Sequence, residues 1–327
     1  MPVIRCTQCR HTAEIPTTSN SHLDCPACGA AQQRAWDTTL FIRKVLQQCA
    51  LQQREIRELR EQIPDTPASQ TAESTLDALD LHNTSALSTT AQHQPLVDWF
   101  TKRQIKAIPN LQAVDTSGFF DEIAVEMGDN LPLLGDVLSK IRWGLQKDVP
   151  NFSIKLGDHS QKDGKTINNF CRRLYENTFL SKYRYQKQEK IVRASVQFLP
   201  AVRNFFNGEW LEWYALMKVL AVLQEKGRNA SCTRNLKITF ANEDLHELDV
   251  FFLLDGRLPV CIECKSGEFR QDIEKLLKLR KRLGLEREHC ILCSPDLSDE
   301  QAAGLSSMYE LTFTNPAGLT RHLQALL

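Results

Sequence analysis

The chain has 327 residues, 42% of them hydrophobic, and its 40 Lys and Arg balance its 40 Asp and Glu. This length accommodates two or three domains. The balanced charge excludes a chain that is basic throughout, so a nucleic-acid-binding surface has to come from a local patch. No apolar run is long enough to span a membrane, and the stretch MPVIRCTQCR lacks the apolar core of a signal peptide. With 11 cysteines, these features predict a cytoplasmic protein whose thiols are metal ligands or core residues.

Two Cys-x2-Cys pairs in residues 1–34 predict a zinc ribbon, Cys6 with Cys9 and Cys25 with Cys28. Two such pairs complete the tetrahedral thiolate site that Zn²⁺ prefers, and four thiolates leave no open position, so this zinc would be structural. A redox or iron–sulfur site is the alternative. The segment contains three Arg and no Lys. We therefore expect it to contact a protein partner rather than to grip phosphates.

Residues 35–63 contain no Gly or Pro and predict a long amphipathic helix. Steps of three and four along it define an a/d seam of about three heptads. The seam positions are Ile42, Val45, Cys49, Gln52, Ile56, Leu59 and Ile63. We expect a coiled-coil homodimer through this helix, and a single helix packed on its own chain is the alternative.

Residues 64–95 are rich in Thr, Ser, Ala and Gln and contain no Lys, Arg or aromatic residue. Such a segment cannot bury enough apolar surface to offset its chain entropy. It is predicted to be a flexible linker.

Residues 96–200 are predicted to be a mostly helical domain. Residues 131–146 have Pro in the first turn and apolar residues at helical spacing, and residues 168–195 are expected to form one or two further helices. Residues 171–193 contain seven Lys and Arg but only two Glu, and aromatic residues are interleaved with them. This pattern predicts a nucleic-acid-binding surface, in a module that could resemble a winged helix. Its candidate contacts are Arg172, Arg173, Lys182, Arg184 and Lys187.

A solvated basic face is the alternative for that stretch. A sensor or inhibitor-binding role for residues 96–200 is equally open.

Residues 247–267, ELDVFFLLDGRLPVCIECKSG, predict two apolar strands joined by a tight turn at Asp255-Gly256. Asp249 opens the first strand, and Glu263 and Lys265 lie near the end of the second. Because side chains alternate along a strand, Glu263 and Lys265 share one face, and pairing of the strands would bring Asp249 near them. The alternative is a purely structural ion pair between Glu263 and Lys265.

The sequence on both sides of this strand pair also predicts helices and strands. Residues 205–227 predict a helix that carries Glu212 and stops at Gly227, and residues 231–240 predict a strand. Residues 269–283 predict a basic helix, residues 290–294 a buried strand, and a helix–strand–helix closes the chain. The basic helix could hold a substrate backbone, and a solvated surface helix is the alternative. Its candidate contacts are Lys275, Lys278 and Arg282.

The pattern D-x13-E-x-K formed by Asp249, Glu263 and Lys265 resembles the active-site signature of the PD-(D/E)xK, or restriction-endonuclease-like, nuclease superfamily. The resemblance covers about residues 201–327 and implies an αβββαβ core with a central mixed sheet. The stretch NFFNGEWLEWY and the motif strands are also similar to the nuclease domain of CRISPR-associated effectors activated by cyclic oligoadenylates. No Rossmann-like nucleotide-sensing domain is visible upstream. A role in prokaryotic antiviral defence is expected from this resemblance alone.

The resemblance implies metal-dependent phosphodiester hydrolysis, with DNA favoured over RNA. Asp249, Glu263 and the backbone carbonyl of Cys264 would hold Mg²⁺ or Mn²⁺. Lys265 would orient or help deprotonate water and stabilise charge on phosphorus. Glu212 would help organise the metal site, and Glu209 is the nearby alternative for that role. The alternative is a nucleic-acid-binding or scaffold protein whose nuclease fold is silent or is activated by a partner or ligand.

A second set of cysteines, Cys261 with Cys264 and Cys290 with Cys293, also has Cys-x2-Cys spacing. Both pairs lie inside predicted strands, where residues three apart face opposite sides. They are therefore expected to be core thiols rather than a second zinc site. The whole chain is predicted to be a multidomain α+β protein, with an α/β nuclease domain at residues 201–327.

Overall fold

The computed structural model describes residues 3–5, 12–14, 24–29, 35–36, 87, 89–111 and 119–327. The chain divides into two compact units, residues 1–72 and 73–327. Within the described residues, no helix has the length and apolar character needed to cross a membrane.

Three short strands lie in residues 1–72, namely β1 (Val3–Arg5), β2 (Thr12–Glu14) and β3 (Ala35–Trp36). β1 is central and pairs antiparallel with the other two. The second predicted cysteine knuckle is a turn, in which the amide of Gly29 donates to the carbonyl of Cys25 at 2.8 Å. Cys6 and Cys9 lie outside the described residues, so the zinc site stays a prediction.

Residues 37–86 also lie outside the described residues, and they hold most of the predicted coiled-coil helix 35–63 and linker 64–95. At the two ends of this stretch the structure differs from those boundaries. Ala35 and Trp36 pair with β1, and helix α2 (Thr90–Thr101) begins inside the predicted linker.

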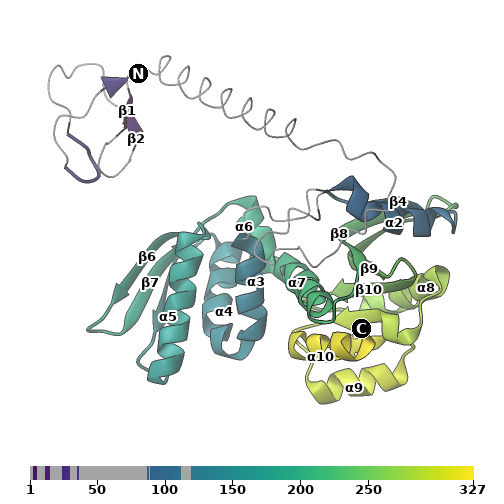
Figure 1. Cartoon of the computed structure of the whole chain (residues 1–327). Coiled ribbons are helices and arrows are strands. Elements are labelled where there is room, and N and C mark those ends of the chain that lie inside the picture. Colours follow the sequence, from purple (N-terminus) through teal and green to yellow (C-terminus); the bar gives the residue numbers. More distant parts are fainter. Residues whose placement is uncertain are drawn as a thin grey trace. The chain divides into compact units, whose positions relative to one another are not determined.

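A six-stranded mixed sheet is the centre of residues 73–327 (Figure 1). Its strands, in spatial order, are β12 (Thr312–Thr314), β11 (Cys290–Cys293), β10 (Leu258–Cys264), β9 (Leu245–Leu254), β8 (Ala230–Thr239) and β4 (Lys106–Ile108). The pairs from β4 to β10 are antiparallel, whereas β10–β11 and β11–β12 are parallel. The predicted α+β class with a central mixed sheet is confirmed for this region.

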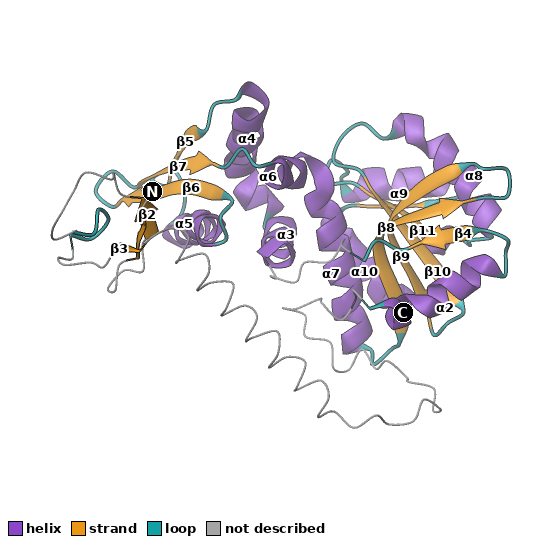
Figure 2. Cartoon of the chain, turned by 90° about the horizontal axis from the view of Figure 1, so that it is seen from above, coloured by secondary structure: helices purple, strands orange, loops and turns teal. Residues whose placement is uncertain are grey.

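Helices pack on both faces of this sheet, around the orange strands of Figure 2. Alternate residues of β9 divide between two hydrophobic cores, as the two-residue period of a strand requires. Val250 and Phe252 belong to the core that contains α7 (Trp210–Glu225) and α10 (Pro316–Leu326). Phe251 and Leu253 belong to the core that contains α2 and α8 (Ile273–Leu283).

The order α7, β8, β9, β10, α8, β11 is the predicted αβββαβ order, and α9 (Asp299–Met308), β12 and α10 follow. The predicted tight turn is present, with φ of +47° at Asp255 and +67° at Gly256. α8 ends at Gly284, whose φ is +66°. The expected helix from residue 205 instead starts with a π-helical turn, Phe205–Glu209, before α7.

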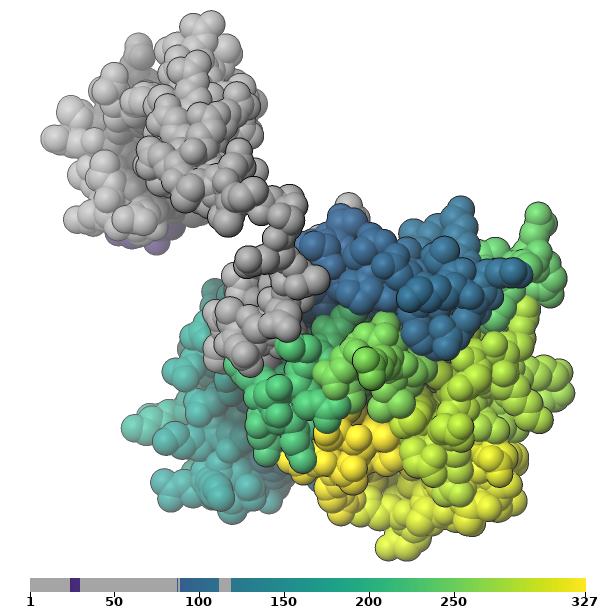
Figure 3. All heavy atoms as spheres, turned by 45° about the vertical axis from the view of Figure 1, so that its right-hand side comes forward, coloured from purple at the N-terminus to yellow at the C-terminus, as the bar shows by residue number. Residues whose placement is uncertain are grey.

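The sequence gives no hint that residues 90–108 belong to this sheet. β4 pairs antiparallel with β8 as an edge strand, and Trp99 and Phe100 of α2 pack against Phe251. In Figure 3 these blue residues lie directly on the green surface of the later chain. Segments on both sides of the smaller lobe, residues 119–200, therefore build one sheet.

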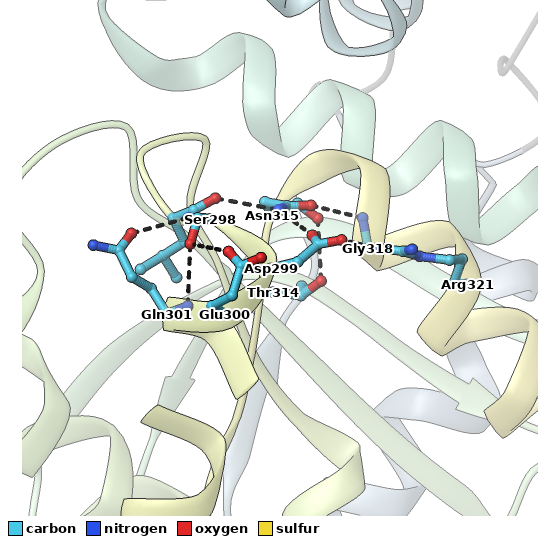
Figure 4. Close-up of polar contacts among 9 residues, drawn as sticks. Ser298, Asp299, Glu300, Gln301, Thr314, Asn315, Gly318 and Arg321 are labelled. Carbon is cyan, nitrogen blue, oxygen red and sulfur yellow. Dashed lines mark hydrogen bonds and ion pairs between the residues drawn. The ribbon is translucent and has the colours of Figure 1, made fainter. Parts of the chain in front are cut away.

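Polar contacts join the starts of α9 and α10 (Figure 4). Ser298 caps α9 through a capping box. Asn315 caps α10, because its side-chain oxygen accepts a hydrogen bond from the backbone amide of Gly318 at 2.7 Å. Asn315 also donates to Asp299 at 2.7 Å, and Asp299 pairs with Arg321 at 2.8 Å. These contacts tie the last two helices to each other beside β12.

The smaller lobe combines helices with a three-stranded antiparallel sheet of order β5-β7-β6. Its elements are α3 (Phe119–Asp129), α4 (Leu131–Lys147), β5 (Asn151–Lys155), α5 (Gln161–Glu176), β6 (Leu180–Gln186), β7 (Ile191–Val196) and α6 (Pro200–Asn204). The helix predicted at residues 131–146 is confirmed as α4.

The helices predicted over residues 168–195 are wrong after Glu176, where the chain forms the hairpin β6–β7. In β7 the side chains of Val192 and Ala194 are buried while Arg193 is exposed, a period of two that fits a strand with one covered face. Cross-strand pairing therefore outweighs the weak local helical pattern. Because β5 separates α4 from α5, those two helices do not form the short-turn pair of a helix-turn-helix.

Candidate active site

The structure brings Asp249, Glu263 and Lys265 together where β9 and β10 pair. The register sets Ile262 opposite Val250, and the Asp249 carboxylate accepts a hydrogen bond from the backbone amide of Cys264 at 2.7 Å. Lys265 Nζ lies 3.0 Å from Glu263 and 3.6 Å from Asp272. The predicted convergence of two carboxylates and an ammonium is therefore present in the geometry.

Burial dominates the electrostatics of this cluster. Burial is the largest cause and the carboxylates of Glu263 and Glu212 add to it, and together they raise the pKa of Asp249 to about 8. Burial alone would lower the pKa of Lys265, but the charge and hydrogen bond of Glu263 raise it to about 12. Asp249 thus lies among like charges and, within the described residues, forms no ion pair of its own.

Glu212 lies in the first turn of α7 and belongs to the same cluster, although its bonding partner is Arg234. Arg234 Nη1 lies 2.8 Å from Glu212, and the Arg234 side chain is only 7% exposed. The guanidinium also stacks on Trp213, 3.7 Å from the ring centroid. Burial raises the pKa of Glu212, while Arg234 lowers it. Arg234 therefore fixes the position of the predicted helix glutamate.

Sequence reasoning missed Arg234, and one signal could have found it. The strand ASCTRNLKIT places a cation in a segment whose neighbours are buried on both sides. A buried cation needs a carboxylate partner, and Glu212 is an acidic residue in the otherwise apolar stretch 210–217 of α7.

Asn235 is a second residue that the sequence did not point to. It falls opposite Asp249, between the cross-strand pairs Arg234 with Val250 and Leu236 with Leu248. Its φ is +53°, a left-handed conformation that costs energy in a strand but that Asn tolerates. Its amide donates to Glu247 at 3.2 Å, and its buried Oδ1 has no partner among the described residues.

The π-helical turn before α7 packs closely on the residue that follows Lys265. A Cβ on Gly208 would lie 2.8 Å from the hydroxyl oxygen of Ser266, so a larger residue here would displace the Ser266 side chain. The Ser266 hydroxyl donates to the Asn207 carbonyl at 3.2 Å. This contact holds the start of α7, and with it Glu212, against the end of β10.

The donor set of this cluster suits a hard divalent cation. In the described part of the chain, no group of three or more His, Cys, Asp or Glu side chains is arranged to hold a metal ion. The predicted set needs only two carboxylates, Asp249 and Glu263, with the carbonyl of Cys264, and all three donors are oxygen atoms. A buried Asp249 that lies close to other carboxylates and, within the described residues, forms no ion pair is the observation that fits such an ion.

The structure places the strand cysteines on opposite faces of the sheet, as the strand spacing predicts. Cys261 lies opposite Cys290 in the register, and Cys264 lies opposite Cys293. The first pair packs in the core with α2 and α8, and the second packs on the side of α7 and α10. Burial raises the pKa of each of the four thiols, which therefore stay protonated core groups.

The predicted nucleic-acid contacts of α8 differ in whether their charges are already paired within the fold. Arg282 pairs with Asp244 and stacks on Phe240 at 3.5 Å, so its charge is engaged within the fold. Lys278 pairs with Glu274 at 2.8 Å. Lys275 lines a groove of about 670 Å³ beside these residues and has no ion pair among the described residues.

The predicted contacts of the smaller lobe also separate into two groups. Arg172 lies 3.8 Å from Glu176, and Arg173 lies 2.6 Å from Glu126. Lys182, Arg184 and Lys187 are exposed, and the structure of the described residues gives them no ion pair.

No family model and no curated protein matches the chain. Several solved structures are similar to it, including the following two. Protein VC1899 from Vibrio cholerae is 20% identical, with 71% of this chain and 60% of that chain covered at a TM-score of 0.48. Can2 from Sulfobacillus thermosulfidooxidans, in complex with cyclic tetra-adenylate, is 15% identical, with 70% and 59% covered at a TM-score of 0.47. The chain thus spans about three fifths of the length of these proteins, and alignments of this identity and score carry no functional assignment.

Proposed function

We propose that this protein is a metal-dependent nuclease that hydrolyses phosphodiester bonds of nucleic acid, with DNA as the favoured substrate. One observation carries the proposal. The buried Asp249 carboxylate lies near Glu263 and Lys265 at the end of two paired strands, and it forms no ion pair among the described residues, since Lys265 pairs with Glu263. The D-x13-E-x-K resemblance of these three residues supports the same chemistry.

Asp249 and Glu263, with the backbone carbonyl of Cys264, would hold Mg²⁺ or Mn²⁺. A divalent ion there would supply positive charge for the phosphate and would make a bound water more acidic. Lys265, held 3.0 Å from Glu263, would orient the attacking water and stabilise charge on the phosphate oxygens. Glu212, held by Arg234, would orient water on the α7 side of the site.

The test is nicking of supercoiled plasmid DNA, and of single-stranded RNA in parallel, with Mg²⁺ or Mn²⁺ and with EDTA. We expect metal-dependent cleavage by the native chain, none by Asp249→Asn or Glu263→Gln, and a strongly reduced rate for Lys265→Ala. Glu268→Gln is the matched control, because Glu268 is an exposed carboxylate that contacts Arg270 rather than the site. Cleavage by Lys265→Ala at the native rate would contradict the proposal.

The second candidate is a nuclease fold that is silent until a partner or ligand acts on it. The contact of Lys265 with Asp272 favours this candidate, because a second carboxylate competes for the ammonium. A native chain that binds DNA but does not nick it under any metal condition, while Asp272→Asn does nick it, would support this candidate over a constitutive enzyme.

We also propose that Cys6, Cys9, Cys25 and Cys28 bind one structural Zn²⁺, that residues 35–63 pair two chains, and that the ribbon contacts a protein partner. Metal analysis of the native chain and of Cys25→Ser tests the first proposal, with one zinc ion expected only in the native chain. Light scattering of the intact chain tests the second, and a monomer would rule it out.

A further inference from the structure

The sheet of the smaller lobe has one covered face and one exposed face. Its covered face packs on α5, where Tyr183 donates a hydrogen bond to Asn168 at 2.8 Å. The register sets the residues of the exposed face in rows across the three strands. One row is Asn151, Ser195 and Lys182, the next is Ser153, Arg193 and Arg184, and the last is Lys155, Ile191 and Gln186. We call this exposed face of β5, β7 and β6 the basic sheet face.

Cations dominate the basic sheet face and the β6–β7 turn beside it. Lys155, Lys182, Arg184 and Arg193 lie on the strands, and the turn at residues 187–190 adds two lysines and one glutamate. That glutamate, Glu189, lies 3.6 Å from Arg193. Within the described residues the other five cations form no ion pair. Uncompensated charge of this density in a chain of zero net charge favours a polyanionic partner.

The face is hollowed as well as charged. A cavity of about 470 Å³ is lined by residues of all three strands, among them Lys182, Arg184 and Arg193. At its floor Ser195, which is only 5% exposed, donates a hydrogen bond to Asn151 at 2.7 Å. Cationic side chains around hydroxyl and amide groups provide the donors that phosphate oxygens accept.

The rows of this face contain no aromatic residue, and the two aromatic residues that line the cavity, Phe152 and Tyr183, lie at the alternate strand positions. This arrangement favours one kind of polymer over another. Alternation along β6 places Tyr183 and Tyr185 opposite Lys182 and Arg184, so the tyrosines do not interleave with the cations as the sequence had indicated. Proteins that bind single strands stack the free bases on aromatic rings. A duplex has its bases already stacked and offers two phosphates where a single strand offers one.

We infer that the basic sheet face binds the phosphate backbone of duplex DNA, independently of base sequence. The inference adds to the proposed function the surface that holds the DNA. It depends on the proposed nuclease function only for the identification of the bound polymer as DNA. It assigns Lys155, which the sequence had not singled out, to phosphate contact, and it leaves Arg172, Arg173 and Arg193 to their ion pairs within the lobe.

The test is fluorescence anisotropy of a labelled 24-base-pair DNA duplex, and of one of its strands, with the full chain in EDTA at several salt concentrations. The double variant Lys182→Gln/Arg184→Gln removes two proposed phosphate contacts. We expect it to lower duplex affinity about tenfold at low salt and to reduce the slope of log K against log salt by about 2. The native chain should bind the duplex more tightly than the single strand.

The matched control is Lys162→Gln/Lys165→Gln, which removes two exposed lysines from α5, the helix on the other side of the sheet. It should leave both affinity and slope unchanged. An equal loss in the two double variants, or tighter binding of the single strand, would overturn the inference. If the native chain nicks DNA but the salt slope of Lys182→Gln/Arg184→Gln is unchanged, the inference about the basic sheet face is wrong. The proposed nuclease activity is not affected by that result.

Discussion

The end of β9 and β10 and the basic sheet face use charge in opposite ways. At the end of β9 and β10, buried carboxylates outnumber the cations. Each cation forms an ion pair there, Lys265 with Glu263 and Arg234 with Glu212. On the basic sheet face, exposed cations outnumber carboxylates, and most form no ion pair within the described residues. Charge held by the fold determines geometry, whereas charge left to solvent is available to a partner. Substitutions at the two places should therefore have different consequences.

The largest effect is expected at Lys265. Lys265→Ala removes the ammonium that lies 3.0 Å from Glu263 and should lower the cleavage rate by about 10²–10³-fold, as loss of one electrostatic donor does elsewhere. Duplex affinity should stay at the native value because the basic sheet face is intact. Single-turnover cleavage and anisotropy on the same preparation measure the two quantities. Equal losses of cleavage and binding would show that catalysis and DNA binding are not separated between the end of β9 and β10 and the basic sheet face.

The next effect is on stability, at the buried ion pair. Arg234→Ala leaves Glu212 buried without its cation and should lower the free energy of unfolding by on the order of 3 kcal/mol. Urea denaturation monitored by Trp fluorescence measures this loss. Adding Glu212→Gln to Arg234→Ala should recover part of it, because the uncompensated charge is gone. No recovery in the double variant would mean that lost packing on Trp213, rather than the charge, causes the loss.

A third prediction concerns pH and tests whether the carboxylates crowd one another. The pKa of Asp249 is raised to about 8 in the folded chain, so folding favours its protonated form. The contribution of Asp249 to the stability of the native chain should then be greatest at pH 4 and below, near the unfolded pKa of Asp, and should fall as the pH rises towards 8.

Asp249→Asn cannot ionise and should escape that loss. In EDTA its melting temperature should exceed that of the native chain by about 2–4 °C at pH 8, with little difference near pH 4. Calorimetry at pH 4, 6 and 8 checks this, with Asp299→Asn as the control, since the pKa of Asp299 is lowered by Arg321. A difference of the same size at every pH would contradict the prediction.

The smallest effect should come from the basic sheet face. Lys182→Gln/Arg184→Gln removes exposed charges without ion pairs and should change the free energy of unfolding by less than about 0.5 kcal/mol. By contrast, Arg173→Gln breaks an ion pair with the largely buried Glu126 and should cost more. Urea denaturation of both variants gives the comparison. A large loss in the first variant would place those cations in the fold rather than on a binding surface.

The sequence by itself determined the strand–turn–strand at residues 247–267. The period-two pattern, the Asp255-Gly256 turn and the positions of Asp249, Glu263 and Lys265 are local features, and local features can be read without a fold. The parity that keeps Cys261 and Cys264 on different faces is local in the same way. The stops of α7 and α8 near glycines follow from the left-handed conformation that glycine adopts freely.

The tertiary structure alone decided the rest. Arg234 meets Glu212 across 22 residues, and β4 joins β8 across the whole of the smaller lobe. No local pattern specifies such pairings, because their energy comes from contacts that exist only after the chain has folded. The hairpin β6–β7 replaced a predicted helix for the same reason. Once the hairpin exists, the alternation of its side chains separates tyrosines from cations and creates the basic sheet face.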